Sequence, residues 1–544
     1  MRYYLALTLI TILAMSCSKR EKVDLIVTNA KIYTVDSASS VYSSMAIKDG
    51  KIVELGSNSS IVGKYKANQT VDFTGKYVYP GFIDPHCHFL GYGLGLPNAW
   101  LAEARNWNEV VDRLIRNQEQ YPTEWVNGRG WNQNEWDVKE FPTNELLNQA
   151  FPNKPVYIVR IDGHAAIANN KALELARITA NTTIEGGEIV KINGKPTGVL
   201  IDNAMELVRK YIPEPSAKEK TEALLNAQAN CFAVGLTSIH DAGLNTDEVL
   251  LIDSLQKAGT LKMRVNAMLN PTESNYKQFI SKGIYQTERL TVRSIKIYAD
   301  GALGSRGALL LKPYSDAPNN KGIQVEPTAK LDSICKMANE SGYQVCTHCI
   351  GDAAVRLMLD IYANYLEDNN DKRWRIEHSQ IVDPEDLPRY GKLKVIPSIQ
   401  TTHATSDMNW ADERLGDRIK YAYAYQNLLA QNGWLPNGSD FPIENINPLY
   451  GFYAGVARQD LNGEPKDGFQ TENALSREQA LRAMTTWAAK SCFEENMKGS
   501  LAVGNVADFV VLNSDLMNDS IQNIPHEKVV VTYINGEKVF DINM

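Results

Sequence analysis

Histidine and cysteine are scarce in this chain of 544 residues, with eight and seven copies respectively. The sequence also lacks low-complexity stretches and any apolar run long enough to cross the ~30 Å hydrocarbon core of a bilayer. It has no basic stripe, and its net charge of −8 argues against a nucleic-acid partner. The length suffices for one large domain and a smaller one or two. We expect a catalytic or binding body that acts on a small molecule.

The first residues have the pattern of a secretory signal. Arg2 precedes an apolar run over residues 5–14, and small residues then lead to Cys17 and a polar stretch. Residues 14–17 resemble a bacterial lipobox, in which cleavage leaves Cys17 as a lipid-carrying N-terminus. We therefore predict a lipoprotein signal peptide over residues 1–17 and a lipid anchor at Cys17, which would hold the protein in the bacterial cell envelope (periplasm or outer membrane). The alternative is a plain signal peptide with an incidental cysteine.

The other six cysteines are an even number in a chain predicted to be exported. Export permits disulfides, but an enzyme of this size does not need them. Cys346 and Cys349 flank a histidine in a strand-like segment, which is typical of packing rather than of a redox pair. We expect most of the six to be buried thiols.

Short strands with hairpin turns occupy both ends of the chain. Residues 24–35 and 45–54 are strand-like, and the second segment carries an Asp-Gly turn. Residues 507–512 and 529–540 are also strand-like, and the second of these segments carries an Asn-Gly turn. We predict one small β-sandwich built from residues 22–78 and 497–544.

Between the two ends, apolar strand-like segments alternate with segments of helical length. Eight strands are predicted, at residues 78–88, 236–241, 263–269, 295–300, 344–348, 375–378, 395–400 and 435–440. This alternation indicates an α/β fold with a parallel sheet, and eight units indicate a (β/α)8 TIM-type barrel over residues 79–496. The interval between residues 88 and 236 is too long for one connection, so we predict an inserted subdomain at about 95–215.

Six of the eight histidines lie at or just beyond the ends of predicted strands. His86 and His88 close the first strand, and residues two apart on a strand point the same way, which suits one transition-metal ion. His348, His378 and Asp440 close three later strands. Because barrel active sites form at the carboxyl ends of the strands, we predict that these side chains converge on a metal site.

Lys296 is flanked by isoleucines in a predicted barrel strand. Its side chain is expected to point inward, where a bare ammonium group is costly. Two solutions stay open. One is a salt bridge, and the other is carboxylation by CO₂, which turns the amine into an anionic ligand that bridges two metal ions.

A series of motifs along the chain carries a family resemblance. The motifs are PGFIDPHCH (80–88), RIDGH (160–164), GLTSIHD (235–241), KIYADGALGSR (296–306), THCIGD (347–352), IEH (376–378), GSDFP (438–442), GSL (499–501) and AD (507–508). In this order they resemble the amidohydrolase superfamily and, within it, amidohydrolase family 3, to which N-substituted formamide deformylases are related. The resemblance covers residues 24–540.

The resemblance implies a set of six metal ligands: His86, His88, Lys296, His348, His378 and Asp440. The two histidines of the first strand and Asp440 would hold the more buried ion, and a carboxylated Lys296 would bridge to a second ion. One or two divalent ions are expected, since the superfamily contains both variants, and zinc is the expected metal. The insert, through Asp162 and His164, would close over the substrate.

These ligands imply a hydrolytic mechanism. A bound divalent ion lowers the pKa of water from roughly 15.7 to about 7 and polarises a carbonyl group. Asp440 is placed to accept the water proton and to deliver it to the leaving nitrogen. We predict a metal-dependent amidohydrolase whose activated hydroxide cleaves a non-peptide C–N bond in an amide, N-formyl or cyclic amide group.

A second ring of side chains completes the predicted site. His240 and His403 are predicted to act in catalysis by stabilising the oxyanion, and His164 and Asp162 to bind the substrate. For the histidines, the alternative is a hydrogen bond to a neighbouring loop.

Two further residues are predicted to touch the substrate. Arg306 would meet a substrate carboxylate, with a pair to Asp300 as the alternative. Trp131 would line the pocket wall, with packing in the core of the insert as the alternative.

Other functions on this scaffold stay open. They are a deaminase or a dipeptidase, and a non-catalytic binding protein tethered to the membrane. A bridging Lys296 argues against a deaminase, and the complete ligand set gives no sign of lost catalysis. A homodimer is also left open, and the substrate is not specified, because specificity lies in loops.

Overall fold

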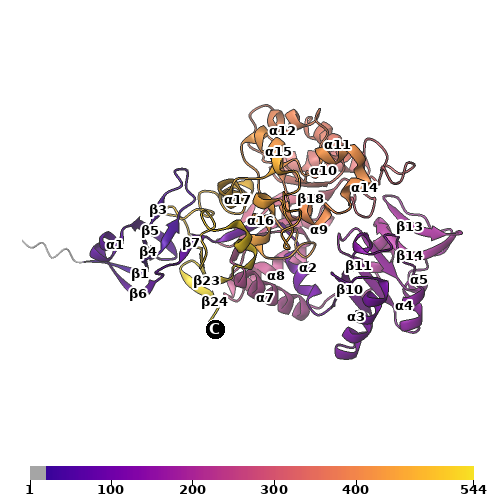
Figure 1. Cartoon of the computed structure of the whole chain (residues 1–544), viewed down its shortest axis with the longest axis horizontal. Coiled ribbons are helices and arrows are strands. Elements are labelled where there is room, and N and C mark those ends of the chain that lie inside the picture. The colour runs from indigo at the N-terminus through magenta and orange to yellow at the C-terminus, as the bar shows by residue number, and fades with distance from the viewer. Residues whose placement is uncertain (1–19, 544) are drawn as a thin grey trace, which may run out of the picture.

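The computed structural model describes residues 20–543, so Cys17 and the predicted signal peptide lie outside the described residues. Figure 1 shows three parts along the long axis of the molecule: a small sheet region at one end, a central body of strands and helices, and a sheet subdomain at the other end. In the described part of the chain, no helix is both long and apolar enough to cross a membrane.

Seven parallel strands form most of a barrel in the central body. In spatial order they are β8 (Phe82–Cys87), β15 (Leu236–Leu244), β16 (Arg264–Leu269), β18 (Leu290–Tyr298), β19 (Gln344–Cys349), β20 (Arg375–His378) and β21 (Ile396–Ser398). A short strand, β17 (Tyr285–Gln286), pairs antiparallel with β18. The parallel order confirms the predicted α/β fold with a TIM-type barrel.

The eighth predicted strand, residues 435–440, closes the barrel without forming a regular strand. Within this segment Asn437 makes one β-bridge, to Ile399. The segment also makes hydrogen bonds to its two neighbours in the barrel. Gly438 N–H donates to the carbonyl oxygen of Ile399 at 3.0 Å, and Asp440 N–H donates to that of His86 at 2.8 Å. The segment therefore lies between β21 and β8, and the barrel is nearly closed.

The first predicted strand, residues 78–88, is divided between two sheets. β7 (Tyr77–Pro80) belongs to a terminal sheet and β8 to the barrel. Gly81 lies between them, and a Cβ atom there would lie 2.3 Å from Thr237 Oγ1. The chain crosses from one sheet to the other at a point where only glycine fits.

Helices cover the outside of the barrel. The longest, α7 (Ala217–Ala233), begins at Ser216, which forms a capping box with Glu219. Leu224 and Phe232 from this helix are buried in the main core. The other helices of the central body are α2 (Phe89–Gly95), α8 (Thr246–Lys257), α9 (Glu273–Gln278), α10 (Thr328–Ser341), α11 (Asp352–Tyr362), α12 (Leu387–Leu393), α13 (Thr401–Asp407), α14 (Ala411–Leu415), α15 (Tyr425–Asn432), α16 (Pro448–Ala457), α17 (Arg477–Ala483) and α18 (Thr486–Ser491).

A six-stranded sheet with four helices lies in the interval between β8 and β15. Its strands are β9 (Ala99–Trp100), β10 (Val126–Trp131), β11 (Val156–Arg160), β12 (Ala165–Ala168), β13 (Gly187–Ile192) and β14 (Lys195–Asp202). The helices are α3 (Trp107–Gln120), α4 (Glu145–Ala150), α5 (Asn170–Leu175) and α6 (Glu206–Arg209). A separate core that includes Trp131, Trp136 and Ile158 holds the subdomain together.

Two further sheets are built from the chain ends. One contains β1 (Glu21–Thr28), β4 (Ser44–Lys48), β5 (Lys51–Gly56) and β6 (Tyr65–Asp72), with α1 (Asn58–Lys64) beside it. The other joins β2 (Lys31–Tyr33), β3 (Val41–Tyr42) and β7 to β22 (Phe509–Leu512), β23 (Val529–Ile534) and β24 (Glu537–Asp541). They share a core that includes Leu25, Met45 and Phe509. The predicted joining of both chain ends in one small sheet region is confirmed.

The six described cysteines are free and buried. This confirms the expectation of buried thiols, and Cys346 and Cys349 pack beside His348 in β19.

Candidate metal centre

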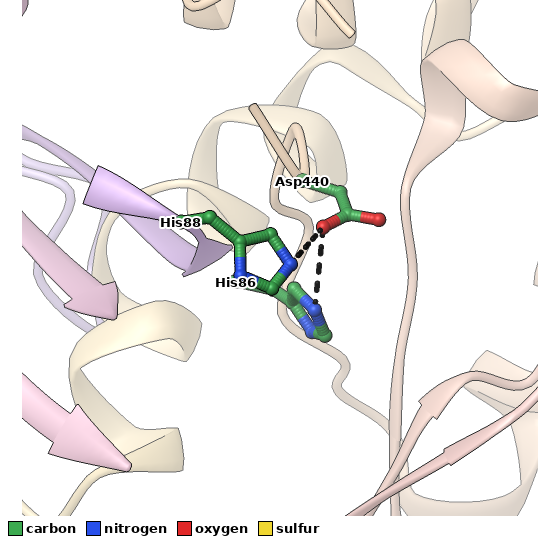
Figure 2. A group of neighbouring side chains, drawn as sticks. All are labelled: His86, His88 and Asp440. Carbon is green, nitrogen blue, oxygen red and sulfur yellow. Dashed lines mark ion pairs between the residues drawn. The ribbon is translucent and has the colours of Figure 1, made fainter. Parts of the chain in front are cut away.

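Two imidazoles and a carboxylate meet at the carboxyl end of β8. His86 Nε2 and His88 Nε2 lie 3.5 and 3.2 Å from Asp440 Oδ1 (Figure 2). One donor atom from each of the three residues lies within 4.8 Å of the other two. His86 is fully buried, whereas the His88 side chain keeps 29% of its surface exposed. The group therefore lies at the boundary between the barrel interior and its mouth.

The donor set fits a divalent transition-metal ion. Two imidazole nitrogens and one carboxylate oxygen are a common zinc combination. Asp440 Oδ1 is buried, and no hydrogen-bond donor among residues 20–543 satisfies it. Such an atom is costly unless a cation or a donor meets it.

The charge states also suit metal binding. Burial, followed by the charge of Lys296, lowers the pKa of His86 to about 4, so the imidazole is neutral at pH 7. Burial raises the pKa of Asp440, but the neighbouring His86 and His88 outweigh this and hold it well below its usual range. A neutral imidazole and an ionised carboxylate are the forms that bind metal.

Asp84 ties the two ligand-bearing segments together. Its carboxylate accepts hydrogen bonds from the His86 backbone N–H at 3.1 Å and from Ser439 Oγ at 2.6 Å. His86 and Asp440 are thus fixed relative to each other through one buried side chain. Sequence reasoning did not single out Asp84, although its place in the first motif was a signal.

Replacing Gly438 with alanine is expected to disrupt the centre. The added Cβ atom would lie 2.7 Å from Asp84 Oδ1 and 2.9 Å from the backbone nitrogen of His86, which cannot move away independently. We expect a loss of about 1–3 kcal/mol of stability from overpacking and weaker zinc binding, measured by chelator competition. Gly63→Ala is the control, since nothing lies within 4 Å of its added Cβ. Unchanged zinc affinity in Gly438→Ala would show that this contact does not set the ligand geometry.

A buried carboxylate holds the other nitrogen of His86. Glu377 accepts a hydrogen bond from His86 Nδ1, and Arg375 Nη2 donates to the same carboxylate oxygen at 2.9 Å. Burial would raise the pKa of Glu377, but Arg375 and His86 hold it well below its usual range. The bond fixes the His86 tautomer, so that Nε2 presents its lone pair toward Asp440. Neither Glu377 nor Arg375 was among the residues predicted for the site.

The other three predicted ligands lie next to this group. Lys296 Nζ is 3.1 Å from His86 Nε2. The His378 ring centre lies 4.9 Å from that of His86 and 4.4 Å from that of His348. Burial lowers the pKa of Lys296 and holds those of His348 and His378 well below their usual values.

His378 reaches this position because its backbone departs from strand geometry. Its φ angle is +72°, and that of the following Ser379 is +41°. Glu377 and His378 are adjacent in β20, yet both contact His86, which regular alternation in a strand does not allow. A non-glycine residue with positive φ at this place marks backbone strain held by the surrounding packing.

Two histidines of the predicted second ring border the group. His164 comes from the insert, and its ring centre lies 4.7 Å from that of His348. His164 Nδ1 bonds to Asp202 Oδ1 at 2.7 Å. His403 stacks against His378 at 5.8 Å, and its buried Nε2 has no hydrogen-bond partner among residues 20–543.

Asp162 and His240 also belong to the predicted second ring, and the structure shows their hydrogen-bond neighbours. Asp162 accepts hydrogen bonds from Arg160 Nη1 at 2.7 Å and from the His164 backbone at 3.1 Å. His240 is fully buried and its Nδ1 lies 3.2 Å from Arg375 Nη1, outside the group of three. The substrate-binding role of Asp162 and the catalytic role of His240 stay predictions.

The structure shows the neighbours of Trp131 and Arg306, and their predicted contacts with a substrate stay predictions. Trp131 has no exposed surface, and its indole N–H donates to the carbonyl oxygen of Ile158, so it packs in the core of the insert. Arg306 pairs with Asp316 at 2.8 Å. Asp300, the alternative partner proposed for Arg306, accepts backbone N–H groups instead, including that of Gly351 at 2.7 Å.

This chain is similar to known proteins along most of its length. The model of the amidohydrolase family matches residues 69–540. Protein LONG AFTER FAR-RED 3 of Arabidopsis thaliana is 34% identical over 95% of this chain and 91% of its own length. Putative amidohydrolase YtcJ of Bacillus subtilis is 31% identical over 94% of this chain and 98% of its own.

The predicted link to deformylases and the fold are also supported. N-substituted formamide deformylase of Arthrobacter pascens is 25% identical over 94% of this chain and 97% of its own length. The crystal structure of an uncharacterized metal-dependent hydrolase from Pyrococcus horikoshii has a TM-score of 0.74 at 29% identity, over 91% of this chain and 99% of that one. The chain belongs to the amidohydrolase family, as a hydrolase of the metal-dependent amidohydrolase superfamily.

Proposed function

We propose that this protein hydrolyses a non-peptide C–N bond in an amide, N-formyl or cyclic amide group. The observation that carries the proposal is the convergence of His86 Nε2, His88 Nε2 and Asp440 Oδ1, with the last atom buried and unsatisfied within residues 20–543. A divalent cation bound there would supply Lewis-acid polarisation of a carbonyl group and acidification of water.

The side chains of this site have separate tasks in such a reaction. Asp440 accepts the proton of the attacking water and returns it to the leaving nitrogen, because its carboxylate is held ionised. His403 offers an unpartnered buried Nε2 for the oxygen that gains charge. His164 comes from the insert beside His348, where it would contact the substrate.

An N-formyl or similar acyl group on an amine is the substrate class that we favour. Support comes from the N-substituted formamide deformylase, which is 25% identical along nearly the whole chain. Lys296 would carry a carboxylate formed from CO₂ and allow a second ion beside His348 and His378. Its fully buried position next to His86 supports this part of the proposal.

The substrate proposal is tested by turnover of simple N-formyl and N-acyl amines by zinc-loaded protein, with released amine as the readout. We expect turnover that a chelator removes and zinc restores. Release of amine that persists after complete metal removal would contradict the role of the centre. Release of ammonia from aminated heterocycles without cleavage of any N-acyl amine would favour a deaminase instead.

We also propose that Cys17 carries a lipid that anchors the protein in the bacterial cell envelope, on the pattern of residues 14–20. Mass spectrometry of the N-terminal peptide after expression in a bacterial host tests this. A diacylated Cys17 is the expected result, and an unmodified Met1 would overturn it.

A further inference from the structure

Arg129 lies on a β-bulge of the insert sheet. It is paired with Val159 in β11, whereas Trp131, two residues on, is paired with Arg160, so the register shifts at this point. Gly130 between them has a φ angle of +115°. Bulges of this kind change the direction of a side chain and are common next to active sites.

The guanidinium group of Arg129 has few partners. Its Nη2 donates to the carbonyl oxygen of Ile161 at 3.2 Å, and its Nε is buried without a hydrogen-bond acceptor in residues 20–543. In the same part of the chain no carboxylate forms an ion pair with it. Arg160, a buried arginine of the same sheet, differs because it pairs with Asp162 at 2.7 Å. A largely buried cation without a partner is costly unless a ligand supplies the anion.

Arg129 lies beside the segment of the insert that carries His164, a neighbour of the candidate metal centre. Its Nη2 lies against Gly163, where an added Cβ would approach to 3.1 Å. Gly163 directly precedes His164, whose ring lies 4.7 Å from that of His348. Burial lowers the pKa of Arg129, and the charges of Asp440 and then Asp162 oppose this, which agrees with a location facing the same space.

We propose that Arg129 binds a carboxylate group of the substrate, so that the substrate is an N-formyl or N-acyl amine bearing an anion, such as an N-formyl amino acid. The inference rests on the proposed function. Asp162 is already paired with Arg160, and Asp440 faces the two metal-binding imidazoles, so neither satisfies the guanidinium. The planar guanidinium matches a carboxylate with two parallel hydrogen bonds. Arg306, the arginine predicted for this task, is paired with Asp316 instead.

The test compares binding and cleavage of matched anionic and neutral probes by the zinc-loaded full chain. The probes are N-formylglycine, N-formylleucine and N-formylphenylalanine, each beside its neutral amide. We expect the wild-type protein to bind at least one acid about 10- to 100-fold more tightly than its amide by calorimetry. Arg129→Gln should remove this preference, Arg129→Lys should keep part of it, and Arg306→Gln should leave it unchanged.

The outcomes separate the inference from the proposed function. Absence of any preference for the acids in wild type, or a full preference in folded Arg129→Gln, would overturn the role of Arg129. Cleavage of both members of a pair at equal rates, together with equal binding, leaves the hydrolase proposal intact and rejects the carboxylate site. A preference that Arg129→Gln removes, without cleavage of any probe, supports the carboxylate site while the proposed reaction fails.

Discussion

Replacing Asp440 with asparagine is expected to lower kcat by about 10²- to 10⁴-fold while much of the bound metal stays in place. Asparagine keeps an oxygen at the position of Oδ1, which faces His86 Nε2 at 3.5 Å and His88 Nε2 at 3.2 Å. It cannot accept and return a proton as the ionised carboxylate does. The measurement is kcat on the best N-acyl amine, together with zinc content per chain.

Asp407→Asn is a matched control for this experiment. Asp407 is a partly buried acid at the end of α13, and burial raises its pKa to about 7. It accepts a hydrogen bond from Tyr423 Oη at 2.8 Å and is not among the grouped metal donors. We expect this variant to keep most of its activity. If Asp440→Asn kept full kcat with zinc bound, the proton-transfer role of Asp440 would be rejected.

Replacing Glu377 with glutamine is expected to weaken zinc binding by about 10- to 100-fold, although Glu377 is not itself a predicted ligand. The carboxylate that accepts from His86 Nδ1 would be lost, and with it the fixed tautomer of the ligand. Arg375, which is fully buried, would also lose its paired charge. Breaking such a buried pair destabilises a protein by about 3–5 kcal/mol.

A second buried acid separates the effect on metal from the effect on folding. Glu494 pairs with Lys498 and accepts from Thr291 Oγ1 at 2.6 Å, without contact to His86. Glu494→Gln should lower the free energy of unfolding in the metal-free protein as Glu377→Gln does, yet keep wild-type zinc affinity. Chelator competition and urea unfolding give the two quantities. Equal zinc affinities in the two variants would mean that Glu377 only stabilises the fold.

The candidate ligands were predictable because they depend on local rules. His86 lies near the end of β8 and His88 follows two residues later, so strand alternation predicts that both point to one side. His348 lies near the carboxyl end of β19, a neighbouring parallel strand of the same barrel. The convergence of these side chains can therefore be expected without knowing the strand register or any long-range contact.

The contacts that hold the candidate ligands in place could not be predicted from local sequence patterns. Glu377 lies 291 residues from His86 in the chain, and their bond follows from the closure of the barrel. Because His378 has a positive φ angle, its side chain and that of the adjacent Glu377 both contact His86. The details of the insert were also not predictable from the sequence. Trp131 packs in its core, which was the alternative to a pocket position, and Arg129, two positions earlier, lies at a bulge.

The segment 435–440 shows a further limit of pattern reading. Its apolar start and polar end predicted a regular strand, but it makes a single bridge and a few hydrogen bonds. A Cβ at Gly438 would meet Asp84 and His86, so the segment lies closer to β8 than a strand with side chains could. This close approach brings Asp440 beside the two histidines.

X-ray diffraction at the zinc absorption edge from zinc-loaded crystals tests the central claim most directly. The account predicts an anomalous peak about 2.0–2.2 Å from His86 Nε2, His88 Nε2 and Asp440 Oδ1. A strong zinc peak elsewhere in the molecule, with nothing between these three atoms, would contradict it.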